Sequence, residues 1–189
     1  EGYAAERSRL LQTIDQEGIH NVVFIAADLH GTLVNNLTYQ TAPFTPQIPT
    51  GAFEVITGAV AFDAPLGPTL VELGTQLGLI SAAQRAYYDT LPRAGQDLFV
   101  QQLVDGFLVQ LGYDPLGLAG SPVQATLVRG GYTAAHTFGW TEFDVDARTQ
   151  VLTVTTWGIA PYREADLANP GNVIDRQPEI VAQFVVAPR

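Results

Sequence analysis

This chain of 189 residues contains no cysteine, no methionine and no lysine. Without cysteine it has neither a disulfide framework nor a thiolate that could bind a metal, and the sequence does not indicate its redox compartment. Without methionine it has no initiator residue, and it begins Glu1-Gly2-Tyr3 with no charged-then-apolar leader. We therefore expect a processed chain or a piece of a longer protein.

Positive charge is also scarce. All nine basic residues are arginines, and they face 19 acidic residues, which gives a formal net charge of -10. No basic stretch could follow a phosphate backbone, so we expect no binding to nucleic acid. A small anionic substrate would need a local source of positive charge, and a metal ion is the obvious one. No apolar run approaches the roughly 20 residues of a membrane span, so we expect no transmembrane segment.

The first 60 residues suggest two strands behind a helix. Apolar residues recur at helical spacing over residues 4–14, and Gly18 would end that helix. Residues 21–27, apolar from Val22 onward, predict a fully buried strand. Residues 35–50 are polar and contain three prolines, which predicts an irregular loop, and residues 53–57 predict a second short buried strand.

The middle of the chain is helical in pattern. We predict helices over residues 69–77, 82–88 and 94–111, with Ser81 as the N-cap of the second. Together they form a helical insertion between strands, over about residues 65–115. The 47% apolar content is enough for one sizeable core, so residues 1–189 are predicted to form a single domain or the C-terminal portion of a larger one.

The last third is rich in strand-forming residues. Strands are predicted over residues 141–145, 151–157 and 180–186, and turn-forming residues between the first two predict a hairpin. Strands, then helices, then an antiparallel β group predict an α/β fold with a mixed sheet.

Polar side chains follow the first predicted strand at the point where it ends. Asp28 and His30 are two residues apart, so in an extended chain they point to the same side. Carboxylates suit hard cations, imidazole suits iron or zinc, and Asn35 adds a neutral amide oxygen. The alternative is a solvated loop in which Asp-x-His occurs by chance.

Other polar residues give weaker indications of a functional role. His136 lies in an aromatic and glycine-rich segment and would form a pocket wall near the site, or simply be satisfied within a loop. Asp144 and Asp146 resemble a carboxylate pair but are better explained as hairpin turn residues, and Asp63 could face a cation. His20 is expected on the surface. No Gly-x-Ser-x-Gly elbow and no glycine-rich phosphate loop is present.

Three segments resemble the alkaline phosphatase D (PhoD-like) family in order and spacing. Residues 2–14 are similar to its lead-in, Gly-Tyr-x-x-x-Arg-x-x-Leu-Leu-x-x-Ile. Residues 27–37 resemble its Gly-Asp-Val-His-x-x-Trp-x-Asn-Asp-Leu segment, and residues 54–60 resemble the strand that follows. The resemblance covers about the first 60 residues.

This resemblance implies a metal-dependent phosphoesterase of the calcineurin-like superfamily, with metals at the edge of a two-sheet sandwich flanked by helices. The resemblance further implies the properties of the PhoD-like branch, whose members are secreted or periplasmic, use calcium and iron, and hydrolyse phosphomonoesters and phosphodiesters. By position, Asp28 would be a metal ligand, and His30 would be a ligand or a phosphate-facing acid–base group. Asn35 would shape the site.

The chain departs from the family pattern at several positions. Ala27 replaces a glycine, Leu33 replaces a tryptophan and Asn36 replaces an aspartate. The superfamily's earlier metal ligands have no counterpart here and would precede Glu1. We therefore expect the C-terminal part of a phosphatase, inactive alone, with the N-terminal portion of the same enzyme as its partner.

Two alternatives from other classes remain open. The chain could be a non-catalytic β-rich binding or assembly module that has lost the site, since Ala27 and Leu33 depart from the pattern. It could also be an acidic, calcium-stabilised adhesion-type domain, which predicts a calcium-dependent melting temperature without hydrolysis.

Overall fold

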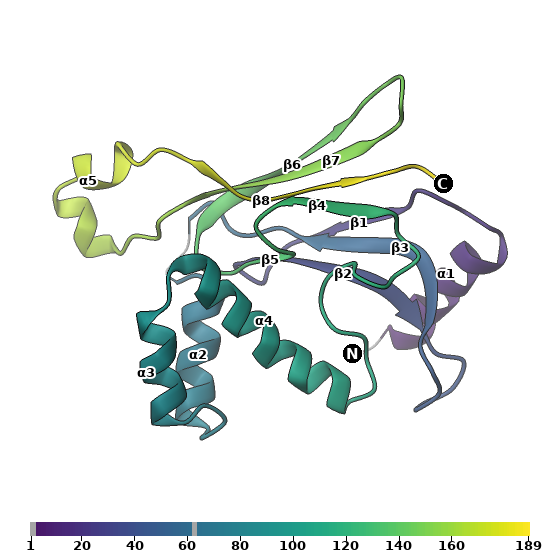
Figure 1. The fold of residues 1–189 in the computed structure, drawn as a ribbon, viewed down its shortest axis with the longest axis horizontal. Helices are drawn as coiled ribbons and strands as arrows, with labels where there is room; N and C mark the ends of the chain where they lie inside the picture. The colour runs from purple at the N-terminus through teal and green to yellow at the C-terminus, as the bar shows by residue number, and fades with distance from the viewer. Residues whose placement is uncertain (1–2, 62–63) are drawn as a thin grey trace.

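Two four-stranded sheets pack face to face, with helices at their flanks, in the computed structural model, which describes residues 3–61 and 64–189 (Figure 1). One sheet, sheet A, has the strand order β1-β3-β2-β5, and the other, sheet B, has the order β4-β8-β7-β6. The predicted two-sheet α/β sandwich with flanking helices is confirmed.

Sheet A is a mixed sheet. It consists of β1 (Val23–Ala26), β2 (Thr32–Tyr39), β3 (Ile48–Ile56) and the short β5 (Thr133–Ala134). β1 runs parallel to β3, whereas β2 is antiparallel to both of its neighbours, β3 and β5. The carboxyl ends of β1, β3 and β5 therefore meet the start of β2 at one edge of the sheet. This edge is called the strand-end edge below.

The second strand overturns one prediction, because residues 35–50 were expected to form an irregular loop. β2 occupies residues 32–39, and β3 begins at Ile48. The other side of β2 is also hydrogen-bonded: Val34 donates its N–H to the carbonyl of Tyr132, and Asn36 donates to that of Gly117. The backbone groups of this polar strand are thus hydrogen-bonded to residues far away in the sequence. A local sequence pattern does not reveal such partners.

The first strand is shorter and more exposed than predicted. β1 spans four residues and pairs only with β3 among the described strands, so it lies at the sheet's edge. The side chain of Ile25 is 61% exposed. The prediction of a fully buried strand was wrong because an apolar run alone cannot distinguish a central strand from an edge strand with an uncovered face.

Each face of sheet A has its own apolar core. Between the two sheets lie the buried residues Val34, Phe53, Val55, Leu118, Val123, Val154 and Phe184. On the opposite face, α1 (Ala4–Gln16) packs Leu11 and Ile14 against Leu37 and Tyr39. The helix predicted over residues 4–14 is confirmed.

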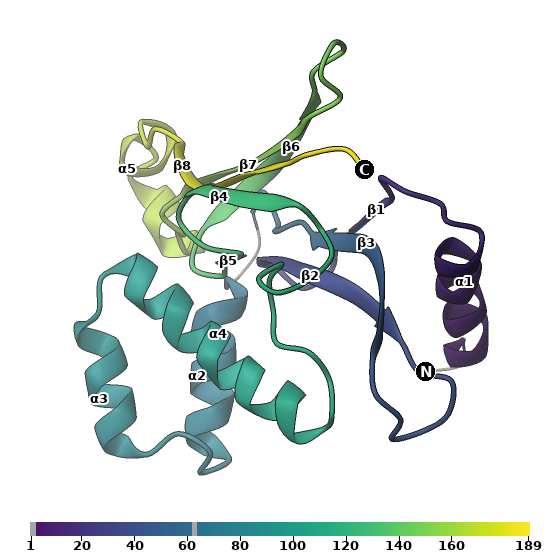
Figure 2. The same cartoon turned by 45° about the vertical axis from the view of Figure 1, so that its right-hand side comes forward.

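The three central helices form a unit on the side of the molecule away from α1 (Figure 2). They are α2 (Leu66–Gln76), α3 (Ala82–Thr90) and α4 (Arg93–Gln110), close to the predicted bounds. Ser81 caps α3 as expected, in a reciprocal capping box with Gln84. Their shared core contains Val71, Ile80, Tyr88, Val100 and, from the loop after β5, Ala135.

Sheet B is antiparallel and formed by the last third of the chain. It contains β4 (Ala125–Arg129), β6 (Phe138–Val145), β7 (Leu152–Ile159) and β8 (Glu179–Val186). The predicted β6–β7 hairpin is confirmed. A 3-10 helix (Glu164–Ala168) and the short α5 (Gly171–Ile174) lie between β7 and β8. In the two described ranges, no helix combines the length and the apolar character needed to cross a bilayer.

Candidate functional site

Asp28 and His30 lie just beyond the carboxyl end of β1, at the strand-end edge, as the sequence indicated. Asp28 is exposed and His30 is half-buried. Both have left-handed backbone conformations, with φ of 85° and 54°. L-residues other than glycine seldom adopt this region, and such residues concentrate at functional sites. Two of them at alternate positions mark an unusually constrained loop.

Neighbouring strand ends hold this loop in place. Thr57, directly after β3, donates both its N–H and its hydroxyl hydrogen to the carbonyl of Ala26, at 2.8 and 3.1 Å. Gly58 donates its N–H to the hydroxyl oxygen of Thr32, at 3.1 Å. These contacts hold the end of β1, the end of β3 and the start of β2 together, so the Asp28–His30 loop starts from a fixed backbone position.

The helical unit also contacts this loop. The backbone N–H of Leu66, the first residue of α2, donates to the carbonyl oxygen of His30 at 3.0 Å. The first N–H groups of a helix have no partner within the helix, so the His30 carbonyl satisfies one of them. His30 also has a further interaction.

Asn35 lies away from the strand-end edge. It occupies the middle of β2, opposite Glu54 of β3, and is half-buried. Three residues of extended chain, about 10 Å, separate it from Thr32 at the edge. Leu33, at the family's tryptophan position, is buried within the sheet at 7% exposure, where it does not form a solvent-facing wall.

His136 follows β5 and is buried, at 5% exposure. Its Nδ1 lies 2.6 Å from Oδ1 of Asp97 in α4, and its Nε2 lies 2.7 Å from the hydroxyl of Tyr88 in α3. Because a carboxylate only accepts, Nδ1 donates to Asp97 and Nε2 accepts from Tyr88. The sequence indicated neither partner, since residues 39 and 48 positions apart carry no spacing signal.

The remaining candidates have structural roles or lie elsewhere. Oδ1 of Asp146 accepts hydrogen bonds from the hydroxyl and N–H of Thr149 and the N–H of Arg148, and these bonds lower the pKa of Asp146. It is the turn residue that the hairpin pattern predicted. His20 is exposed, as expected. Asp63 lies outside the described residues.

The donor types at the strand-end edge fit a metal, but their number is small. Asp28 offers carboxylate oxygens and His30 offers an imidazole nitrogen, a combination suited to hard and borderline cations. Within residues 3–61 and 64–189, no group of three or more His, Asp or Glu side chains is arranged to hold a metal ion. The described part of the chain therefore presents two metal-type donors, Asp28 and His30, at this edge.

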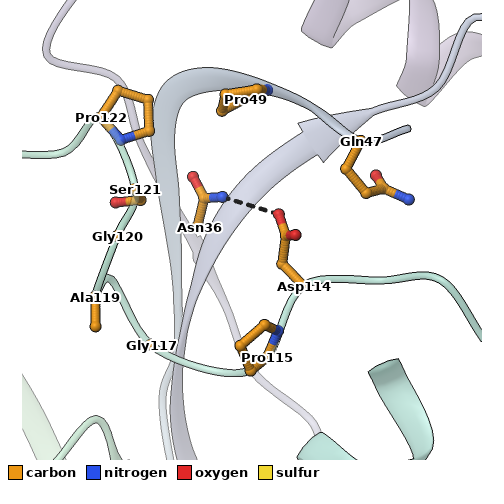
Figure 3. A pocket seen from close by; sticks show the side chains of 10 residues that line it. All are labelled: Asn36, Gln47, Pro49, Asp114, Pro115, Gly117, Ala119, Gly120, Ser121 and Pro122. Atoms are coloured by element: carbon orange, nitrogen blue, oxygen red, sulfur yellow. Dashed lines mark hydrogen bonds between the residues drawn. The ribbon is translucent and has the colours of Figure 1, made fainter. Parts of the chain in front are cut away.

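A cavity of about 250 Å³ lies beside β2, away from Asp28 and His30 (Figure 3). Asn36 points its amide toward Asp114 and donates to Oδ2 at 3.3 Å, whereas its own Oδ1 is buried without a partner among the described residues. Among the described residues, no basic side chain lines the cavity, whose walls are Asn36, Gln47, Pro49, Asp114, Pro115, Gly117, Ala119, Gly120, Ser121 and Pro122. With a carboxylate and no cation, it is a poor site for a phosphate group.

A second cavity, of about 400 Å³, lies beside the start of α2. Pro65 lines it, directly before the residue that donates to His30. Arg163, Tyr162 and Asp166 also line this cavity. An anionic group in this cavity would meet one arginine and one aspartate, next to the helix that contacts the Asp28–His30 loop.

Comparison with known proteins identifies the family of this chain. A model of the PhoD-like phosphatase family matches residues 1–96, which are 96 of the 189 residues. The chain therefore belongs to the PhoD-like phosphatases, as its motifs suggested. The match contains Asp28, His30 and Asn35 and ends before β5 and His136. No curated protein and no solved structure matches the chain.

Proposed function

We propose that this chain is part of a metal-dependent phosphoesterase that hydrolyses phosphomonoesters and phosphodiesters. One observation carries the proposal: Asp28 and His30 both take left-handed conformations at the carboxyl end of β1, inside the segment that the family model matches. Ligands commonly bind at the carboxyl ends of parallel strands in α/β sheets. Strained ligand-type residues at that edge support a site there.

In this proposal Asp28 binds a metal through its carboxylate. His30 either binds the metal through its imidazole or gives a proton to the leaving-group oxygen. When bound, metal ions would supply positive charge to the phosphoryl oxygens and acidify a water molecule. The family resemblance favours calcium and iron, and Asp28 and His30 suit these two metals respectively.

Other residues act around this centre. Arg163, in the cavity beside the start of α2, would attract the anionic substrate, which the net charge of -10 otherwise repels. His136 would shape the site from its position directly after β5. Asn35 would do so through β2, at a distance of several residues from the edge.

The remaining metal donors would come from the N-terminal portion of the same enzyme. Asp28 and His30 are too few to hold a catalytic metal pair. The edge position of β1 and the 61% exposure of Ile25 are consistent with a further strand adding beside β1. The isolated 189-residue chain would then be inactive. We further propose, from the family resemblance, that the enzyme is secreted or periplasmic.

The test measures hydrolysis of an aryl phosphate monoester and diester by the full-length enzyme. Asp28→Asn removes the carboxylate charge and His30→Asn removes the imidazole, and both keep a residue that tolerates left-handed backbone. We expect each to reduce kcat by about 100-fold or more, the scale of a lost acid–base group. His20→Asn, in the exposed turn before β1, is the matched control and should retain full activity. Full activity in both ligand variants would refute the proposal.

A non-catalytic module is the second candidate. The absence of a three-donor group among the described residues and the replacements at Ala27 and Leu33 favour it. Elemental analysis of the full-length protein separates the two functions. Bound iron or calcium that disappears in Asp28→Asn supports the enzyme, whereas a metal-free protein without phosphate affinity supports the module.

A further inference from the structure

A buried hydrogen-bonded chain links two helices to the loop after β5. Tyr88 of α3, His136 and Asp97 of α4 are joined by contacts of 2.7 and 2.6 Å. Oδ1 of Asp97 also accepts from the N–H of Ala135, at 2.7 Å. Tyr88 and His136 are 4% and 5% exposed, so water cannot easily replace either partner. We call these three side chains the Tyr88–His136–Asp97 network.

The network resembles a catalytic triad in connectivity, but it is not placed to react. Burial raises the pKa of Tyr88 to about 12, so its hydroxyl stays protonated and is a poor nucleophile. The ring of Tyr88 packs against Phe99 and His136 inside the core of the helical unit. Any function of the Tyr88–His136–Asp97 network must therefore act through neighbouring residues.

Two glycines connect the network with the Asp28–His30 loop. Gly67 of α2 lies directly against the imidazole of His136, and a Cβ at position 67 would overlap the ring. Gly67 also donates its N–H to the carbonyl of Ala135, at 2.7 Å. Gly31 fits so closely that an added Cβ would lie 2.9 Å from Cβ of Leu66 and 3.3 Å from Cα of Ala135.

The start of α2 is thus held on both sides. The His136 ring and the Ala135 carbonyl fix Gly67, and the preceding residue, Leu66, donates to the carbonyl of His30. A loop with two left-handed residues persists only when its surroundings over-determine that conformation. The strand ends supply part of that constraint, and the start of α2 supplies the rest.

We propose that His136 is a positioning residue: held by Asp97 and Tyr88, it fixes the start of α2 and thereby the backbone of the loop that carries Asp28 and His30. The helical unit then stabilises the backbone conformation of the loop at the strand-end edge. This inference rests on the proposed function for its effect on catalysis, but the mechanical coupling can be measured without any activity.

The first measurement is backbone hydrogen exchange in the full-length protein and its variants. Asp97→Asn removes the charge beneath His136, and Tyr88→Phe removes one hydroxyl. We expect both to speed exchange of the Leu66 N–H, while the N–H of Phe184 in sheet B keeps its wild-type rate. Tyr87→Phe is the matched control, because Tyr87 is the adjacent residue on α3 and is 61% exposed.

A network that only stabilises the fold would behave differently. Disrupting such a network would accelerate exchange at Leu66 and Phe184 together, in proportion to the drop in melting temperature. This result would overturn the proposal. Unchanged exchange at Leu66 in both variants would do the same. If Asp97→Asn fails to fold, Tyr88→Phe decides, since it deletes a single atom from a core that remains packed.

The second measurement is steady-state kinetics with an aryl phosphate. We expect Asp97→Asn to lower kcat about 10- to 100-fold, as the loss of a supporting contact behind a metal ligand does, with KM little changed. The two proposals fail separately. A full-length enzyme without phosphatase activity refutes the proposed function while hydrogen exchange still tests the coupling. An active enzyme whose kcat is unchanged in Asp97→Asn and Tyr88→Phe refutes the positioning role.

Discussion

Gly67 and His136 are in direct contact, and the ring of His136 occupies the space that a Cβ at position 67 would need. The ring cannot easily withdraw, because Asp97 and Tyr88 hold its two nitrogens. Glycine is therefore required here by close approach, even though it is an unfavourable residue in a helix. The relationship yields the first prediction, on stability.

Gly67→Ala is expected to destabilise the protein by about 1–3 kcal/mol, the typical cost of an overfilled core. The helix propensity of alanine opposes this loss only in part. Urea denaturation of wild type and variant measures the difference. The control is Gly106→Ala in α4, where nothing lies within 4 Å of an added Cβ. That variant should gain about 0.5–1 kcal/mol, and equal effects at both positions would contradict the packing argument.

Tyr88 predicts a loss of stability at alkaline pH. Burial raises the pKa of its hydroxyl from 10.0 to about 12 in the folded protein. The folded state thus holds this proton more tightly than the unfolded state does. The associated stability is fully present below pH 10 and is lost as the pH rises toward 12, by on the order of 2 kcal/mol.

Denaturation of wild type and Tyr88→Phe across this pH range tests the prediction. At neutral pH the variant should be less stable by about 1 kcal/mol, because it lacks the hydrogen bond to His136. The difference should shrink and then reverse as the pH approaches 12, since phenylalanine has no proton to lose while wild type loses more than the initial gap. Tyr87→Phe should run parallel to wild type throughout. A constant gap between wild type and Tyr88→Phe would show that Tyr88 does not titrate with folding.

The backbone of Asp28 predicts an order of stability among substitutions. Its φ of 85° suits asparagine and glycine but disfavours residues with an ordinary Cβ. Asp28→Asn should lie within about 0.5 kcal/mol of wild type, while Asp28→Ala should lose about 1–2 kcal/mol. Thermal denaturation at matched protein concentration measures both. If alanine is tolerated as well as asparagine, the loop is not held in the conformation described.

Much of the fold could be predicted because its signals are local. The three central helices and the β6–β7 hairpin follow from apolar spacing, the Ser81 cap and turn residues such as Asp146. β2 could not be predicted in the same way. Its polar middle is stabilised by hydrogen bonds to β3 and to the carbonyl of Gly117, about 80 positions away.

The same distinction between local signals and distant contacts applies to the candidate site. Asp28 and His30 were recognisable because ligand-type residues directly follow an apolar run and match a family motif. Asp97, Tyr88 and Leu66 were not, because their roles arise from contacts between distant segments. His136 was singled out from its aromatic surroundings, but its burial against Gly67 is a property of the folded chain.

Arg163 predicts an effect on substrate affinity if the proposed function holds. Arg163 lines the cavity beside the start of α2, in a chain whose net charge repels anions. Arg163→Gln should raise KM for an aryl phosphate monoester by about tenfold, or about 1.4 kcal/mol, and leave kcat nearly unchanged. Arg148→Gln, at the exposed tip of the β6–β7 hairpin, changes the net charge equally and serves as the control.

Salt concentration separates a local contact from the general field. An effect of the overall charge would be similar in both arginine variants and would fade as salt screens it. A direct contact in the cavity would appear only in Arg163→Gln and would persist at higher salt. Equal KM values for the two variants would therefore remove Arg163 from the substrate site, and the positive charge needed by the substrate would have to come from the metal ions alone.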